Sequence, residues 1–161
     1  AILAVMVGGG LRRSEVAALR VDHVQQRDGR WVIVDMVGKG GRVRSVPMPS
    51  FAKTALDGWL SAAGVTSGRV FRSTQGGRVC GDGLSAAAVG DVVKLYSEQA
   101  GVKVAAHDLR RTFAKLAYRN GAPIDQVQLS LGHQSIMTTQ RYLGTSQDLQ
   151  NAPCDRLGLS L

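Results

Sequence analysis

The 161-residue sequence lacks features that define several classes of protein. Its two cysteines, Cys80 and Cys154, form neither a CxxC motif nor a metal-spaced cluster, so we expect incidental thiols in a reduced, cytoplasmic protein. No apolar run approaches the ~18 residues of a membrane-spanning helix, so no membrane partner is expected. An acidic cluster with the spacing of a two-metal site is missing too.

The beginning of the chain, AILAVMVGGG, has no charged n-region and no cleavage site after a longer apolar core, so it is not a secretory signal. The apolar run instead suggests a core helix that is cut open at its start. We therefore expect the polypeptide to be an N-terminally truncated piece of a longer protein.

Negative charge is also scarce. Twelve Asp and Glu stand against 20 Lys and Arg, which gives a net charge of +8 and a pI near 10.2. Strongly basic domains commonly bind polyanions, although a basic surface can serve solubility alone. No basic amphipathic helix carries an aromatic face, so nucleic acid is favoured over a membrane as the partner.

Hydrophobic periodicity predicts a single, mainly α-helical domain with a small antiparallel β-hairpin. The predicted elements, in chain order, are a helix over residues 14–19, strands over 31–37 and 42–47, a helix over 50–63 capped by Ser50, and a helix over 84–100. The last helix would face inward with Leu84, Ala88, Val92, Leu95 and Tyr96. Residues 64–83 have the composition of a loop, pinned to the core by Val70 and Phe71.

Residues 107–142 hold the densest set of side chains able to bind or attack a phosphate. A helix that begins near Asp108 would carry an apolar stripe of Leu109, Thr112, Phe113, Leu116 and Ala117. His107 and Arg110 are three residues apart, so both would point the same way from its first turn.

A short helix is expected to follow and to stop at Gly132, because glycine tolerates the left-handed conformation that closes a helix. His133 would then lie in a turn, free to project into a cleft. Ser135 is the expected N-cap of a last helix that carries Tyr142.

Five motifs follow one another along the chain: GGLRRSE at residues 9–15, GKGGRVRSVP at 38–47, HDLRRT at 107–112, LGH at 131–133, and a tyrosine nine residues after that histidine. Each motif alone is a weak signal. Together, in this order and spacing, they resemble the catalytic domain of the tyrosine recombinases, the phage-integrase family, from Gly10 to Tyr142. The resemblance implies an α+β fold, mainly α-helical with a small antiparallel β-sheet.

The same resemblance implies the site residues. The matched positions are Arg12 as the first catalytic arginine, Glu15 as its acidic support, Lys39 as the general-acid lysine, His107 and Arg110 as the His-x-x-Arg pair, His133 as the later histidine, and Tyr142 as the nucleophile. Basic side chains near them are expected to contact DNA phosphates, namely Arg42, Arg44 and Arg111.

These residue types suit attack on a phosphodiester without a metal ion or other cofactor. A phenol keeps its proton at neutral pH unless a base or positive charge lies near, and two guanidinium groups can hold both non-bridging phosphate oxygens. A lysine can protonate the leaving 5′-oxygen, and the 3′-phosphotyrosyl link retains the bond energy for rejoining. His107 could accept the tyrosine proton or bind the phosphate, and His133 could donate to a phosphate oxygen; the sequence leaves these roles open.

The implied activity is site-specific recombination or integration by a DNA strand transferase that acts on double-stranded DNA and self-associates as a tetramer on two sites. Residues 1–146 would form the catalytic domain, and the tail 147–161 would pack on a neighbouring protomer or on its own domain. Two alternatives stay open: a module that binds DNA without cutting it, and a type IB topoisomerase. The lack of a long insertion before Tyr142 favours the recombinase.

Overall fold

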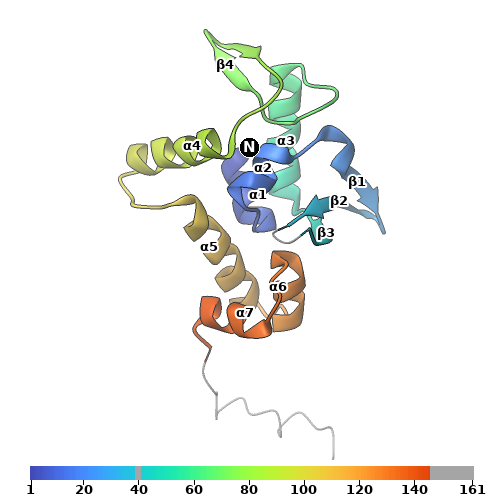
Figure 1. Cartoon of the computed structure of the whole chain (residues 1–161), viewed down its shortest axis with the longest axis vertical. Helices are drawn as coiled ribbons and strands as arrows, with labels where there is room; N and C mark the ends of the chain where they lie inside the picture. The colour runs from blue at the N-terminus through green and yellow to red at the C-terminus, as the bar shows by residue number, and fades with distance from the viewer. Residues whose placement is uncertain (39–40, 146–161) are drawn as a thin grey trace, which may run out of the picture.

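A computed structural model of the chain describes residues 1–38 and 41–145 (Figure 1). Its elements, in chain order, are α1 (Ile2–Gly9), α2 (Arg13–Ala18), η1 (Val21–His23), β1 (Val24–Arg27), β2 (Arg30–Val37), β3 (Val43–Pro47), α3 (Ser50–Ala63), β4 (Ser73–Gln75), β5 (Arg78–Cys80), α4 (Ala86–Gln99), α5 (Ala106–Arg119), α6 (Ile124–Leu131) and α7 (Ile136–Leu143). The predicted mainly helical α+β fold is confirmed. The predicted tail and Lys39 lie outside the described residues.

Helix α1 forms the centre of the main hydrophobic core. Val5 and Met6 are fully buried, and the helix packs against α3 and α5. It ends at Gly10, which has φ of 60°, and a Cβ atom there would lie 2.6 Å from the ring of Phe113. Glycine is therefore needed where the chain leaves α1 and turns toward Arg12.

A second, smaller hydrophobic cluster holds the last three helices together. Ala114 of α5, Val127 of α6 and Leu131 are buried there, with Phe113 and Tyr142 packed against them. Figure 1 shows α6 and α7 at the opposite end of the molecule from β4, with α6 beside β3. The helix that carries the predicted nucleophile therefore belongs to a different cluster from the helix that follows Arg12.

The three-stranded antiparallel sheet has the order β1-β2-β3 and contains a strand that the sequence analysis missed. β1 pairs with β2 through a two-residue turn at Asp28 (φ 49°) and Gly29 (φ 75°). Positive φ at both positions is the type I′ geometry that Asp-Gly favours in hairpins, so the dipeptide was a usable signal.

Strand β2 contains a bulge that changes which side chains face inward. Its register with β3 shifts between Ile33 and Met36, and Asp35 within it has φ of 55°. Beyond the bulge Met36 lies opposite Arg44, and Arg44 and Val46 alternate with exposed neighbours on one face of β3. Strand β3 therefore places Arg44 on the same face as buried Val46.

In helix α4 the buried face differs from the one predicted from the sequence. In α4 the buried residues are Val89 and Val93, whereas Leu95 and Tyr96 are about half exposed. The buried residues of α4 differ from the predicted ones because α4 packs against α2, and that contact decides which side chains are covered.

The predicted N-cap of the next helix upstream, α3, is also displaced. Ser50 is the first residue of α3, and the cap position is Pro49.

Helix α5 also departs from its predicted stripe. It begins at Ala106, two residues before the expected start, and it buries Arg110 and Ala114 while Leu116 is half exposed.

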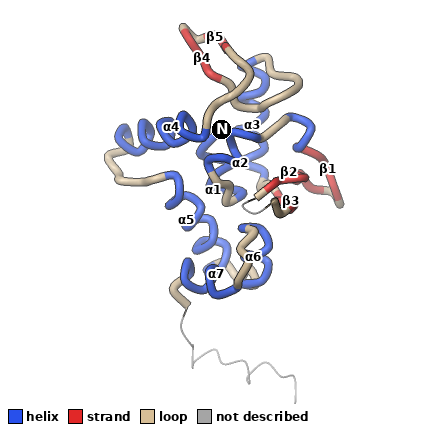
Figure 2. Tube along the Cα trace, viewed as in Figure 1, coloured by secondary structure: helices blue, strands red, loops and turns tan. Residues whose placement is uncertain are grey.

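Residues 64–83, predicted as a loop, are held to the core by buried Val70 and Phe71. They also form the small β4–β5 hairpin, which stands apart from the larger sheet (Figure 2). No helix within the described ranges is long and apolar enough to cross a membrane.

Candidate active site

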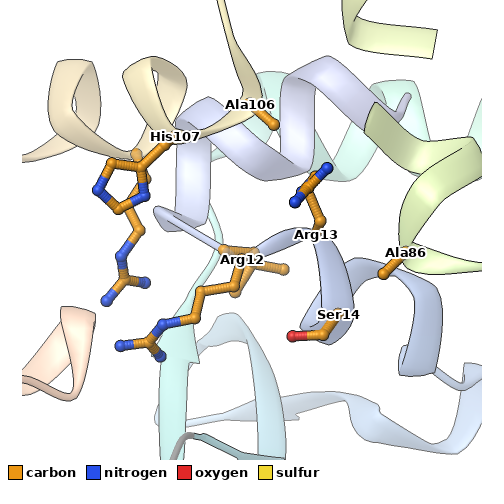
Figure 3. Close-up of a pocket in the computed structure, with 8 residues that line it drawn as sticks. Arg12, Arg13, Ser14, Ala86, Ala106 and His107 are labelled. Carbon is orange, nitrogen blue, oxygen red and sulfur yellow. The ribbon is translucent and has the colours of Figure 1, made fainter. Parts of the chain in front are cut away.

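The predicted catalytic residues of the described chain lie where α2 and α5 begin, in the turn between α6 and α7, and on α7. A pocket of about 290 Å³ opens between the N-terminal ends of α2 and α5. Arg12, His107 and Arg110 line it, and so do Arg13 and Ser14. Figure 3 shows Arg12 extending toward the side of the pocket where His107 lies, while Arg13 extends in another direction. Helix starts also direct backbone N–H groups outward, which favours a negatively charged ligand.

Glu15 is the centre of the cationic cluster. Its carboxylate accepts hydrogen bonds from Arg12 Nη1 and from the Arg12 backbone N–H, both at 2.7 Å, and from both terminal nitrogens of Arg44 at 2.9 Å. Burial alone would raise the pKa of Glu15, but the bonds from Arg44 and Arg12 outweigh it and lower the pKa to about 2. Glu15 is therefore a buried anion that orders Arg12 and Arg44.

Arg110 is held by the backbone as well as by charge. Its guanidinium donates to the carbonyl oxygens of Gly10 and Leu131 and lies 4.0 Å from Glu15. Its side chain is 1% exposed, and its Nε finds no acceptor within the described residues. Burial, followed by repulsion from Arg12, lowers the pKa of Arg110 to about 10, so the group stays cationic at neutral pH.

The hydroxyl of Tyr142 and Nε2 of His107 share a hydrogen bond across 35 residues of sequence. Their rings meet edge to face with centroids 5.4 Å apart. Burial, then the charges of Arg110 and Arg111, lower the pKa of His107 below its ordinary 6.5. The lowered pKa favours a neutral imidazole, whose Nε2 can accept the phenolic proton when the ring proton is on Nδ1.

His133 lies beside the same tyrosine and is held by a residue that sequence analysis missed. Its ring centroid is 4.8 Å from that of Tyr142, and its Nδ1 is 3.0 Å from the hydroxyl of buried Thr139. Burial, then Arg110 and Arg12, lower the pKa of His133 to about 4. The ring is buried rather than free in a turn, and Thr139 fixes its orientation. Thr139 lies three residues before Tyr142 on α7, a helical spacing that could have drawn attention to it.

The remaining predicted residues differ in their surroundings. Arg111 pairs with Asp108 at 3.9 Å and its guanidinium carbon lies 5.7 Å from the Tyr142 ring centroid, so it borders the site from an exposed position. Arg42 is exposed. Arg44 instead points inward with a side chain only 9% exposed, which does not favour its predicted contact with DNA.

No group of three or more His, Cys, Asp or Glu side chains able to hold a metal ion occurs in the part of the chain that the structure describes. The fixed positive charge comes from arginines: Arg12, Arg44 and Arg110 surround a single carboxylate. One negative charge among three positive ones leaves a net cationic site, suited to a phosphodiester.

Comparison with known proteins agrees with this geometry. A profile of the phage integrase family matches residues 1–148. Tyrosine recombinase XerC of Pseudomonas entomophila is 36% identical over 155 residues, covering 94% of this chain and 48% of XerC. Tyrosine recombinase XerA of Pyrococcus furiosus is 33% identical over 141 residues, covering 88% of this chain and 48% of XerA. The chain thus spans about half the length of these relatives.

Solved structures give the same result. The crystal structure of XerA recombinase superposes with a TM-score of 0.73 at 28% identity, covering 89% of this chain and 52% of that one. XerH site-specific recombinase, bound to its difH substrate, gives a TM-score of 0.71 at 28% identity over 92% of this chain and 43% of XerH. The family profile, the sequence relatives and the shared fold all lead to one conclusion: the chain belongs to the phage integrase family, and its structure is that of a tyrosine recombinase catalytic domain.

Proposed function

We propose that the chain carries out site-specific recombination of double-stranded DNA by cleaving and rejoining strands through a 3′-phosphotyrosyl intermediate on Tyr142. The observation that carries this proposal is the hydrogen bond between the Tyr142 hydroxyl and Nε2 of His107, beside the cluster of Arg12, Arg44 and Arg110 around Glu15. A nucleophile, a base and preorganised cations are the three groups that a metal-free attack on a phosphodiester needs.

In the proposed reaction, Tyr142 passes its proton to His107 Nε2 as its oxygen bonds to phosphorus. Negative charge that develops on the non-bridging oxygens is held by Arg12 and Arg110. The bond from phosphorus to the 5′-oxygen breaks, and that oxygen takes a proton, for which Lys39 is the proposed donor by family resemblance. Attack by another strand's 5′-hydroxyl on the phosphotyrosine reverses the steps, so strand joining needs no external energy source.

We propose further that Arg42 and Arg111 contact DNA phosphates and that His133 donates to a phosphate oxygen through Nε2. A tetramer on two DNA sites, with residues 147–161 packed on a neighbour, is also proposed. The relatives named above are recombinases, and XerH is bound to difH substrate in a pre-cleavage complex. These relatives favour recombination over simple DNA binding or topoisomerase activity.

The proposal is tested with a nicked suicide duplex that carries a candidate recombination half-site, incubated with the chain in Mg²⁺ or in EDTA. We expect a covalent protein–DNA band on a denaturing gel, with the same yield in both, because arginines supply the charge that a metal would otherwise supply. Loss of the band in EDTA would contradict the metal-free mechanism. Binding in a gel shift without any covalent band would select the DNA-binding module, and relaxation of supercoils without strand exchange would select the topoisomerase.

A further inference from the structure

Arg44 occupies an interior position that differs from that of the other basic residues predicted to contact DNA. It lies on the inward face of β3, two residues from fully buried Val46, and its side chain is 9% exposed. Three of its donors are used within the protein: two hold the Glu15 carboxylate at 2.9 Å, and Nε donates to the Ser130 carbonyl oxygen at 2.8 Å. Each of its three nitrogens thus donates to a protein acceptor, so the guanidinium is oriented toward Glu15 and Ser130.

The hydrogen bonds from Arg44 to Glu15 connect Arg44 to Arg12. Both carboxylate oxygens accept from Arg44, and the same two oxygens accept from Arg12, one from its side chain and one from its backbone. A bidentate arginine fixes the plane of a carboxylate as well as its position. The direction of the Arg12 guanidinium therefore depends on Glu15, and that of Glu15 depends on Arg44.

The hydrogen bond from Arg44 to the Ser130 carbonyl oxygen connects Arg44 to the end of α6, just before the turn that carries His133. Ser130 lies near the end of α6, and Gly132, the residue before His133, packs against the arginine stem. A Cβ atom at Gly132 would lie 3.1 Å from Arg44 Cδ, and φ there is 63°. Arg44 is thus a direct bridge from the sheet to the turn that carries His133, and it joins segments 86 residues apart in sequence.

We infer that Arg44 is a positioning residue of the cleavage site, which holds Glu15, and through it Arg12, in register with the His133 turn, and that it is not a DNA contact. The inference rests on the proposed function for its consequence on rate, but the contacts that carry it do not depend on that function. Arg44 touches no reacting atom; its effect passes through Glu15 and the turn.

The first test replaces Arg44 with Gln or Lys and measures single-turnover formation of the covalent band at saturating DNA, together with DNA affinity over a range of salt concentrations. We expect Arg44→Gln to lower the rate by about 10²-fold, because misplacing a catalytic group by an ångström costs about that much. Arg44→Lys, which keeps the charge but cannot grip both oxygens, should recover only part of the rate. DNA affinity and its salt dependence should be unchanged in both.

Arg42→Gln is the matched control, since Arg42 is exposed and two residues away along the same segment. If Arg42 contacts a phosphate, its loss should lower the slope of log affinity against log salt by about one. The same loss of slope in Arg44→Gln would overturn the inference and restore Arg44 as a DNA contact. Melting curves of every variant show that rates are measured on folded protein.

A second test combines Arg44→Gln with Glu15→Gln. Because the two residues act through one contact, the double variant should cleave at most about threefold slower than the slower single variant, whereas independent effects would multiply. Its melting temperature should likewise not fall below that of the less stable single variant. Fully multiplicative rates and additive melting shifts would overturn the inference. The melting and salt measurements need no cleavage, so failure of the proposed function would not be mistaken for failure of the positioning role.

Discussion

Replacing Tyr142 with phenylalanine is expected to abolish the covalent protein–DNA complex, a loss on the order of 10⁴-fold or more, because no other group can supply the attacking oxygen. The ring stays and only the hydrogen bond to His107 Nε2 is lost, so the fold should survive with a cost of about 1 kcal/mol. DNA affinity should stay within about twofold, since the hydroxyl contributes no charge to phosphate binding. A denaturing gel and a gel shift on the same samples measure both quantities.

Tyr118→Phe is the matched control for that experiment. Tyr118 lies on α5, is 42% exposed, and does not line the pocket beside Arg12 and His107. It should form the covalent complex at the wild-type rate. A covalent band that persists in Tyr142→Phe would show that another residue attacks the DNA.

Replacing Glu15 with glutamine is expected to lower the free energy of unfolding by about 3 kcal/mol at neutral pH, because it leaves buried Arg44 and Arg110 without their shared anion. The lowered pKa of Glu15 gives the same magnitude: the difference between 4.5 and about 2 corresponds to about 3 kcal/mol. Since the folded pKa lies below the unfolded one, this contribution is fully present above pH 4.5 and is lost as the pH falls toward 2.

Denaturant unfolding of wild type and Glu15→Gln across that pH range measures the effect. The two curves should lie about 3 kcal/mol apart at neutral pH and converge as the pH falls. Asp57→Asn breaks an exposed pair with Lys53 and should cost less than about 1 kcal/mol. Parallel wild-type and Glu15→Gln curves over the whole acidic range would show that the Glu15 carboxylate does not hold the cluster together.

The sequence predicted the helices and strands better than the contacts of the candidate site. Strands and helices carry periodic signals, and the order and spacing of the motifs are enough to mark His107 and Tyr142. The hydrogen-bond partners of Arg110 could not be predicted, because both are backbone carbonyl oxygens and one belongs to a residue 100 positions away. Every residue has a backbone carbonyl, so the sequence does not indicate which one accepts a hydrogen bond. Only the fold brings such groups together.

Arg44 is the position where two signals in the sequence point to different roles. Its charge suggested DNA, while its place two residues before Val46 on a strand predicts the same inward face. The displaced stripe on α4 has a related cause, since periodicity shows that a helix has a buried face but the packing partner decides which one. Thr139 was missed because a hydroxyl has no strong pattern of its own.

The attacking residue is identified by isolating the covalent complex, digesting both protein and DNA, and sequencing the linked peptide by mass spectrometry. We expect one modified peptide, with Tyr142 joined to a nucleotide through a 3′-phosphate. Attachment at another residue, or to a 5′-phosphate, would contradict the proposed intermediate.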